Sequence, residues 1–547
     1  MRRYVKKGKF SVTATSGTYV VALGFNVEES DTSGLLGFAI NRADRTEGEK
    51  YWLRGIKTFE ETVPNPIPGM LYSTLEHPVQ SFHWGDYTAK ADHKYTYTVV
   101  PLFGTPKNLQ QGLPVEIDVA TESQDVGTHA VYFNRGVAGS QAYRDKFGTK
   151  KPEDVKNRRA FVWLSRGLEE AMLSFISQAS GPEYGLRASV YEFNYLPVLE
   201  AFRKAADQGA DVKIVYDSRK ENPREQSDAA IDKAGIRALV KRREANPSYL
   251  SHNKFVILLK KGKPLELWSG STNITLGGIF GQANVGHIVR DKKIASKFLE
   301  YWLELYNDCP VKELRAWNSS EMPDPAGPCA PNTMMPLFSP RETLEALRWY
   351  AEKMDEAKEM VCLTAAFGVH KFLKDVLSRK KDCSRYVILD KKGKDYDALC
   401  KVPNVQVAVG SHLAQDTLYR WAREKITNYN VHVRYVHTKF MLLDPLSDNP
   451  ITIEGSANFS DASTKNNDEN SLVISGDKRV ADIYLGEFMR LFNHFYFRYV
   501  VQNQKAKTGS EEKQRSYLKP DDSWVKKYYQ KGSKSERERI MFGRKPT

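Results

Sequence analysis

The chain has 547 residues, of which 41% are apolar and 27% charged, with a formal net charge of +14. This length is too great for one ordinary hydrophobic core, so about three domains are expected. The composition is that of a soluble globular protein. The basic balance, with a pI of about 9.2, favours polyanionic partners such as nucleic acid or an anionic phospholipid surface, with a merely solubilising surface as the alternative.

The five cysteines are odd in number and form no Cys-x-x-Cys pair. This pattern argues against a disulfide framework and against a zinc cluster, and it suits a reducing compartment. Arg2, Arg3, Lys6 and Lys7 begin the chain, but the residues after them lack the apolar core of a signal peptide. No run approaches the roughly 20 apolar residues of a membrane span. We therefore expect a cytoplasmic protein without a transmembrane segment.

The first 125 residues have the pattern of an all-β domain. Three short apolar strands are expected there, at residues 19–25, 37–40 and 94–102. In the last of them Tyr95, Tyr97 and Val99 alternate onto one face. Turn-forming residues separate the strands, as in a β-sandwich. In this alternation the region resembles a fibronectin type III or immunoglobulin-like module, and we expect it to be structural rather than catalytic.

Helices and strands alternate from about residue 126 to residue 320. We expect a helix, a strand, a second helix and a second strand, at residues 160–177, 187–193, 197–209 and 210–217. Pro197 suits the first turn of the second helix and Gly209 suits its end. A strand, a helix and a strand in this order favour a parallel crossover unit.

The same order returns after a proline-rich linker. Five prolines between residues 323 and 336 mark the boundary between two halves. Beyond them the pattern predicts a helix, a strand, a helix and a strand, at residues 344–357, 360–367, 371–377 and 386–390. The last strand matches the one at residues 212–217, so the repeat is the whole half. We expect the domains at residues 1–125, 126–320, 321–504 and 505–547.

Each half carries the same set of polar residues beside short apolar strands. The sets are His252, Lys254, Gly270, Ser271 and Asn273, and His437, Lys439, Gly455, Ser456 and Asn458. The histidine precedes the asparagine by 21 residues in both. Strand residues two apart share a face, so each histidine and lysine point the same way. The glycine before each asparagine lets backbone amides approach an anion. A lone His-x-Lys is more often a solvated pair, but two copies in one register predict a phosphate site.

The doubled His-x-Lys with Gly-Ser-x-Asn resembles the phospholipase D superfamily over roughly residues 126 to 500. The resemblance implies an α/β fold with two tandem α-β-α sandwich halves, related by a pseudo-two-fold axis and sharing one active site. It implies phosphodiester hydrolysis in which one histidine attacks phosphorus and the other protonates the leaving oxygen and then activates water. The lysines and asparagines of both motifs would donate to the equatorial oxygens without a metal or other cofactor.

The two copies differ in their acidic residues. The second copy has Asp444, which completes His-x-Lys-x4-Asp, and Glu469, which lies 11 residues beyond its asparagine; either could orient an imidazole. In the first copy Leu259 stands at the aspartate position, and Asn284 lies 11 residues beyond the asparagine.

A first half without these carboxylates and a second half with a glutamate is similar to the arrangement in the tyrosyl-DNA phosphodiesterases, which belong to the same superfamily. In those enzymes the glutamate crosses over to the first-half histidine, which is the nucleophile. The similarity implies that His252 attacks phosphorus and that His437 is the acid. For His287, which lies nearby in the sequence, we expect a core or surface position.

The last stretch, from Lys505, has 13 Lys or Arg and six Asp or Glu, a net +7 that is half of the charge of the chain. Four aromatic residues are interleaved with these charges: Trp524, Tyr528, Tyr529 and Phe542. Such a tail can stack on nucleic acid. It can equally pack its aromatics onto the body of the protein with the charges in solvent, and the sequence leaves both alternatives open.

The sequence therefore predicts a metal-independent phosphodiesterase that acts on nucleic acid, as a nuclease. The alternative is a phospholipase or transphosphatidylase on phospholipid head groups, which would share the mechanism. A third hypothesis is a degenerate, non-catalytic protein that binds polyanions. Because both His-Lys-Asn sets are present, the sequence favours an enzyme.

Overall fold

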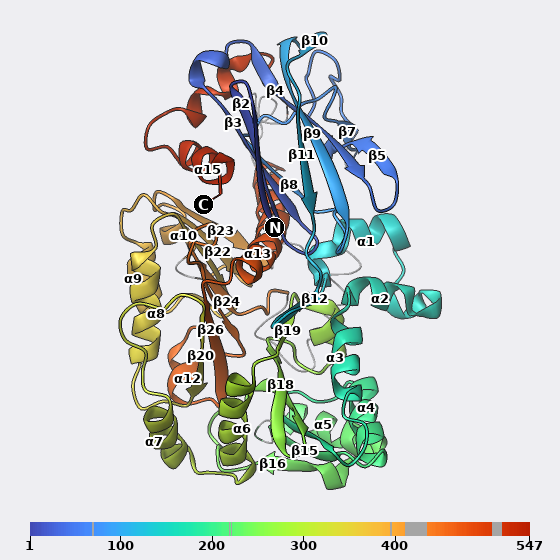
Figure 1. Cartoon of the computed structure of the whole chain (residues 1–547), viewed down its shortest axis with the longest axis vertical. Coiled ribbons are helices and arrows are strands. Elements are labelled where there is room, and N and C mark those ends of the chain that lie inside the picture. Colours follow the sequence, from blue (N-terminus) through green and yellow to red (C-terminus); the bar gives the residue numbers. More distant parts are fainter. Residues whose placement is uncertain are drawn as a thin grey trace.

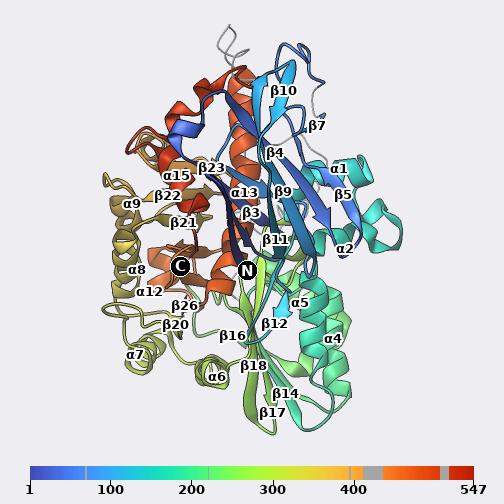
Figure 2. The same cartoon turned by 45° about the horizontal axis from the view of Figure 1, so that its top comes forward.

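The computed structural model describes residues 1–67, 70–217, 219, 221–393, 396–410, 435–505 and 517–546. An antiparallel β unit forms the top of the molecule in Figure 1, and two mixed α/β halves lie side by side beneath it. Figure 2 shows the same three parts with the β unit brought forward. The expected fold class, two similar α/β halves preceded by an all-β region, is confirmed.

Two antiparallel sheets build the N-terminal unit, one in the order β1-β2-β3-β8 and one in the order β10-β9-β4-β5 with β11 paired to β9. Their strands are β1 (Arg2–Lys7), β2 (Phe10–Ser16), β3 (Val21–Val27), β4 (Leu35–Asp44), β5 (Glu49–Trp52), β8 (His83–Asp86), β9 (Lys94–Thr105), β10 (Asn108–Gln111) and β11 (Val115–Ala120), beside the short pair β6 (Arg54–Gly55) and β7 (Tyr72–Ser73). Tyr95, Tyr97 and Val99 of β9 are fully buried, on the inner face that the alternation predicts.

The C-terminal segment packs on this unit. Trp524 and Tyr528 belong to its core, and the Trp524 indole N–H donates to the carbonyl oxygen of Leu35 at 2.8 Å. Phe542 of α15 (Lys534–Gly543) stacks on His83 with ring centroids 5.2 Å apart. These aromatics therefore fill the interior, as the packing alternative predicts. Residues 506–516 of the predicted tail lie outside the described residues.

The first α/β half is an eight-stranded sheet in the order β12-β13-β19-β18-β17-β14-β15-β16. Its strands are β12 (Asp125–Val126), β13 (His129–Phe133), β14 (Tyr184–Val190), β15 (Asp211–Asp217), β16 (Val240–Arg243), β17 (Lys254–Lys260), β18 (Lys263–Gly270) and β19 (Val285–Val289). Its helices are α1 (Ser140–Phe147), α2 (Arg159–Ser165), α3 (Leu168–Ser177), α4 (Leu196–Asp207), α5 (Glu221–Ala234), α6 (Lys292–Tyr306) and α7 (Val311–Glu321). β14 and β15 are parallel, as the crossover pattern predicts.

The second half repeats this sheet in the order β20-β26-β25-β24-β21-β22-β23. Its strands are β20 (Thr333–Ser339), β21 (Met360–Ala365), β22 (Ser384–Leu389), β23 (Val405–Val409), β24 (Phe440–Leu443), β25 (Ile451–Gly455) and β26 (Glu469–Ser475). Its helices are α8 (Glu345–Glu356), α9 (Lys371–Leu377), α10 (Tyr396–Leu399), α12 (Asp461–Lys465) and α13 (Lys478–Lys505). Each strand from β13 to β19 has a counterpart seven strands later, with the same parallel or antiparallel partner. The repeat of the whole half is therefore a property of the fold.

Two local predictions differ from the structure. The helix expected at residues 160–177 is two helices, because Arg166 and Gly167 have positive φ and interrupt it between α2 and α3. The proline-rich linker is not unstructured throughout. Its last residues form β20, which pairs with β26 and places Pro336 opposite Leu472. Proline is tolerated there because β20 is an edge strand.

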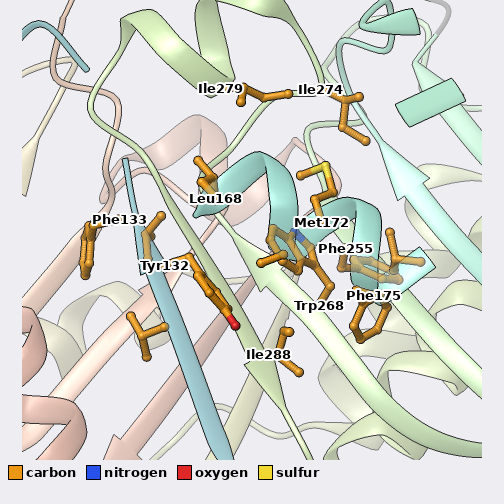
Figure 3. Packing of buried hydrophobic residues seen from close by; sticks show 14 of the residues in the cluster. Tyr132, Phe133, Leu168, Met172, Phe175, Phe255, Trp268, Ile274, Ile279 and Ile288 are labelled. Carbon is orange, nitrogen blue, oxygen red and sulfur yellow. The ribbon is translucent and has the colours of Figure 1, made fainter. Parts of the chain in front are cut away.

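The core of the first half lies between its sheet and its helices. Figure 3 shows Met172 and Phe175 of α3 beside Trp268 of β18, with Ile288 of the neighbouring strand β19 close by. The same cluster continues into the second half through Phe440 and Tyr484, whose ring centroids are 5.2 Å apart. The two halves thus share a packed apolar interface, which holds their facing sheet ends at fixed positions.

Candidate active site

The site lies where equivalent loops from the two halves meet. β15 ends at a buried aspartate, Asp217, and another buried aspartate, Asp390, directly follows β22. Asp217 accepts from the backbone N–H of Ser251 at 2.8 Å, and Asp390 accepts from those of Tyr435 and Val436 at 2.7 and 2.9 Å. Each carboxylate therefore fixes the segment just before a motif histidine. The sequence predicted the two matching strands but not this role of their last carboxylates.

Backbone hydrogen bonds then join each of these segments to the other half. The N–H of His252 donates to the carbonyl oxygen of Asp468 at 2.8 Å, and that of His437 donates to the carbonyl oxygen of Ala283 at 3.2 Å. Asp468 and Ala283 stand directly before Glu469 and Asn284. These bonds bring Glu469 of the second half to His252 of the first, and Asn284 of the first half to His437 of the second.

The two histidines face one another across this junction. Their ring centroids are 6.4 Å apart and the ring planes are inclined by 77°. Nδ1 of His252 lies 2.8 Å from Oε2 of Glu469, and Nδ1 of His437 lies 3.0 Å from Oδ1 of Asn284. Each ring is thus oriented through Nδ1 by a residue of the opposite half. Nε2 of His437 is buried and has no hydrogen-bond partner among the described residues.

The two orienting residues are themselves fixed. Oε1 of Glu469 accepts from the Ser463 hydroxyl at 2.7 Å and from the Asn467 amide at 3.0 Å. The Asn284 amide N–H donates to the carbonyl oxygen of Gly278 at 2.8 Å, so its oxygen must face His437. Because that oxygen can only accept, Nδ1 of His437 carries a proton.

The motif lysines lie beside the histidines, as their spacing predicts. Nζ of Lys439 donates to the carbonyl oxygen of His437 at 2.7 Å, and Nζ of Lys254 donates to that of His252. Both lysines are buried, with 4% of Lys254 and 2% of Lys439 exposed. A phosphate between the imidazoles would therefore meet two ammonium groups in a site of low dielectric constant.

The motif asparagines have different surroundings. The Asn273 amide donates to Oε2 of Glu192 at 2.7 Å, and both side chains are buried. The side-chain oxygens of Asn273 and Asn458 have no hydrogen-bond partner in the described part of the chain. Glu192 was not predicted. The available signal was its position after β14, because polar residues at the carboxyl ends of parallel strands often line a site.

The Gly-Ser turns differ from the expectation that their amides cradle an anion. The N–H groups of Ser271 and Ser456 donate to the carbonyl oxygens of Val285 and Asn470, at 3.0 Å each. Gly270 and Gly455 have φ of 129° and 149°, and a Cβ on either would lie within 2.4 Å of a carbonyl oxygen. The glycines therefore allow close strand contact and set the position of each asparagine.

Asp444 also differs from expectation. It follows β24, at the opposite end of that strand from His437. Its carboxylate accepts from the backbone N–H groups of Lys358, Glu359 and Met360 at 2.8–2.9 Å. These bonds anchor the start of β21. Glu469, not Asp444, occupies the position that orients an imidazole.

Burial shifts the acid–base properties of the site. It raises the pKa of Glu469 to about 7, against the opposing charge of Lys254. It lowers the pKa of Lys254 to about 7, against the carboxylates of Glu469 and Glu192. Burial, with the neighbouring lysine charges, holds the pKa of His437 well below its ordinary value. The negative charge of a bound anion would raise the pKa of both lysines and of His437.

A second buried polar cluster lies apart from these residues. His287, 0% exposed, lies 2.9 Å from His129 and 3.0 Å from the Tyr484 hydroxyl, so of the two expected positions, core or surface, it occupies the core. Glu454, also 0% exposed in its side chain, lies 3.8 Å from His287, and burial raises the pKa of its carboxyl to about 8. Among the described residues, no group of three or more His, Cys, Asp or Glu side chains is arranged to hold a metal ion.

The geometry and the comparisons together define the class of the protein. The model of the family described as "Cardiolipin synthase, PLD-like domain" matches residues 172–306 and 350–492, one segment in each half. These segments make up half of the chain. The protein is therefore an enzyme of phosphodiester chemistry, and it belongs to the phospholipase D superfamily.

Solved structures of this superfamily are similar in part. Nuc from Salmonella typhimurium, described as a phospholipase D family member, is 26% identical over 26% of this chain and 87% of its own, with a TM-score of 0.22. Phosphatidylserine synthase from Haemophilus influenzae is 10% identical over 70% of this chain and 94% of its own, with a TM-score of 0.42. The yeast tyrosyl-DNA phosphodiesterase is 13% identical over 57% and 88%, with a TM-score of 0.31.

No curated protein sequence gives a significant match to the chain. In the described part of the chain, no helix combines the length and the apolar composition that a bilayer crossing requires.

Proposed function

We propose that the protein is a nuclease that cleaves phosphodiester bonds through a phosphohistidine, with His252 as the nucleophile and His437 as the general acid and base. The observation that carries this proposal is the unequal pairing of the two imidazoles, one with the carboxylate of Glu469 and one with the amide oxygen of Asn284.

The pairing assigns the two roles by charge. When Nε2 of His252 bonds to phosphorus, the ring becomes cationic, and the Glu469 carboxylate on Nδ1 stabilises that charge. Asn284 gives His437 only a neutral acceptor, so the protonated ring of His437 is less stabilised and a better proton donor. A carboxylate therefore supports the histidine that must hold a charge, and an amide supports the histidine that must release a proton.

The reaction then has two balanced steps. Nε2 of His252 attacks phosphorus, the bond from phosphorus to the leaving oxygen breaks, and His437 gives its proton to that oxygen. Next, His437 takes a proton from water, whose oxygen attacks phosphorus, and the bond from phosphorus to His252 breaks. The products are a free hydroxyl and a phosphomonoester. Lys254, Lys439, Asn273 and Asn458 are the donors proposed for the charge on the equatorial oxygens.

A pair of cations favours nucleic acid over a lipid head group. Arg219 and Lys392 are exposed, and each lies two residues beyond the aspartate that fixes a histidine segment. The fold repeat therefore sets a cation at the equivalent position of each half, and Lys392 also pairs with Asp397 at 3.1 Å. A polynucleotide has phosphates on both sides of the scissile one, whereas a phospholipid such as phosphatidylcholine or phosphatidylethanolamine carries a single diester. The net charge of +14 acts in the same direction.

Two assays test the proposal. Purified protein with single- and double-stranded DNA in EDTA should cleave at least one of them, and absence of cleavage, or cleavage only with added divalent metal, would contradict it. Release of choline or ethanolamine from phospholipid vesicles, with no cleavage of DNA, would support the lipid alternative instead.

A double variant, assayed with DNA and with a small diester, tests the choice of substrate. Arg219→Gln with Lys392→Gln should raise KM for DNA, and lower the slope of its salt dependence by about one for each phosphate that the protein no longer neutralises. The same variants should leave the hydrolysis of bis(4-nitrophenyl) phosphate, a small diester, unchanged.

A further inference from the structure

One buried carboxylate of the site has no place in the two-step reaction. Glu192 is 4% exposed, and its Oε2 accepts from the Asn273 amide at 2.7 Å. Hydrogen bonds between loops bring the two together, because the Ile274 N–H donates to the Glu192 carbonyl at 3.1 Å and Phe193 pairs with Ile274. The carboxylate is thus built into the wall that holds a phosphate-binding asparagine.

The charge of Glu192 acts on the whole site. Burial lowers the pKa of both Lys254 and Lys439, and the Glu192 carboxylate opposes this shift, second among the carboxylates after Glu469. Asp217 acts on Lys254 and Asp390 on Lys439 in the same direction but less strongly. The first negative charge of a bound phosphate is offset by the lysines and by a protonated His437, whereas a second charge adds repulsion from these carboxylates.

The carboxylate belongs to the first half alone. Val190 pairs with Lys254 across β14 and β17, and the register of β21 with β24 sets Ala365 at the equivalent place beside Lys439. Two residues further on, Glu192 therefore corresponds to Phe367, which is 49% exposed. The fold repeat does not require an acid here, so the contact with Asn273 is a separate feature of this half.

We infer that Glu192 is a specificity-determining residue that admits a singly charged phosphodiester and disfavours a doubly charged phosphomonoester. This inference rests on the proposed function and deepens it. A diester carries one negative charge, whereas a phosphomonoester, the product of its hydrolysis, has a second pKa of about 6 and is a dianion at neutral pH. Glu192 therefore lets the site bind its substrate and release its product.

The test compares two competitors of matched shape, phenyl phosphate and methyl phenyl phosphate, by isothermal titration at pH 5 and pH 8. Wild-type protein should bind the monoester less well than the diester at pH 8, where only the monoester is a dianion. Glu192→Gln keeps an oxygen for Asn273 and removes the charge. At pH 8 this variant should lower the ratio of the monoester Kd to the diester Kd by about tenfold, which is the effect of one removed charge at intermediate dielectric constant. At pH 5 the ratio should change little.

Two further variants separate charge from structure. Glu192→Ala should lower the ratio in the same way, and should also lower kcat because Asn273 loses its acceptor. Glu454→Gln removes another fully buried carboxyl and should leave the ratio at its wild-type value. In progress curves with bis(4-nitrophenyl) phosphate, Glu192→Gln should show stronger inhibition by accumulated monoester.

The outcomes are distinguishable from those of the proposed function. If wild-type protein cleaves the diester and Glu192→Gln, folded by circular dichroism, keeps the wild-type ratio at pH 8, the role of Glu192 is overturned and the phosphodiesterase stands. If wild-type protein cleaves no diester but the ratio shifts as expected, the charge selection holds and the proposed activity fails. An equal fall of the ratio at pH 5 and pH 8 would overturn selection by charge.

Discussion

The two α/β halves have the same strand order, the same buried aspartate before each histidine segment and the same backbone contact with the opposite half. They differ in the side chains that face the site. Glu469 orients one histidine and Asn284 the other, and Glu192 of the first half corresponds to Phe367 of the second. The repeated backbone thus places two imidazoles face to face, and the unequal side chains around them are the basis for the different tasks that we propose.

The largest expected effect comes from removing either imidazole. His252→Ala should abolish the phosphoenzyme and lower kcat by at least about 10⁴-fold, as loss of a nucleophile does in a coupled site. His437→Ala should lower kcat by about 10²–10⁴-fold, because only proton transfer is lost. Steady-state kinetics with bis(4-nitrophenyl) phosphate measure both, and its good leaving group should let His437→Ala accumulate phosphoenzyme. Full activity of either variant would refute a composite site.

Replacement of Glu454, a buried acid of the second half, should give the next largest effect, which is on the free energy of unfolding. Glu454 corresponds to Ser269 of the first half, and burial raises the pKa of its carboxyl to about 8. The neutral form is favoured in the folded protein, so this group costs no stability at low pH and lowers the stability progressively as pH rises from about 4.5 to about 8.

Glu454→Gln should therefore raise the free energy of unfolding by about 4 kcal/mol at pH 9 and change it little at pH 4. Urea unfolding at the two pH values measures the difference. An equal effect at both would show that the carboxyl does not titrate across this range.

The orienting residues should give smaller and unequal effects on activity. Glu469→Gln removes the carboxylate that supports the cationic ring of His252, and should lower kcat by about 10²-fold, the cost of a lost charge-assisted hydrogen bond in a buried site. Asn284→Ala should lower kcat by about tenfold, because it removes a neutral bond.

The pH profile sharpens this contrast. Since burial raises the pKa of Glu469 to about 7, wild-type activity should fall as pH drops below neutrality and the carboxylate is protonated. Glu469→Gln should lose that acid limb, whereas Asn284→Ala should keep it. Equal losses of kcat with identical pH profiles would remove the basis for assigning different roles.

The smallest effect is expected at Asp444, whose counterpart in the first half is Leu259. Its replacement should change the stability of the fold and not the activity. Asp444→Ala removes three hydrogen bonds to backbone amides at the start of β21. We expect a decrease of about 2 kcal/mol in the free energy of unfolding, with unchanged kcat per folded molecule. A fall in kcat without a fall in stability would return Asp444 to the catalytic residues.

The sequence predicted the features that depend on local pattern. Alternation and helical spacing located β9, β15, β22, α4 and α9, and the equal register of the two motifs located both histidine–lysine pairs. The difference between Glu469 and Asn284 was also visible from their spacing. These predictions succeeded because strand period and motif spacing are fixed within short segments.

Features that depend on contacts across the fold could not be predicted in the same way. Asp444 completes a sequence motif, yet β24 carries it away from His437, toward backbone amides of residues 358–360. Glu192 reaches Asn273 only because Phe193 pairs with Ile274, more than 80 residues along the chain. The Ser271 amide, expected to bind an anion, is used in strand pairing with Val285.

The assignment of the nucleophile is the claim that one measurement tests most directly. Protein mixed with ³²P-labelled DNA and quenched in alkali, where phosphohistidine persists, should carry label on a peptide that contains His252, and mass spectrometry should locate the phosphoryl group on Nε2 of that ring. With ³²P-labelled bis(4-nitrophenyl) phosphate, whose leaving group needs no acid, the His437→Ala variant should give the same labelled peptide in greater amount. Label on the His437 peptide, or cleavage of DNA without any labelled protein, would contradict the account.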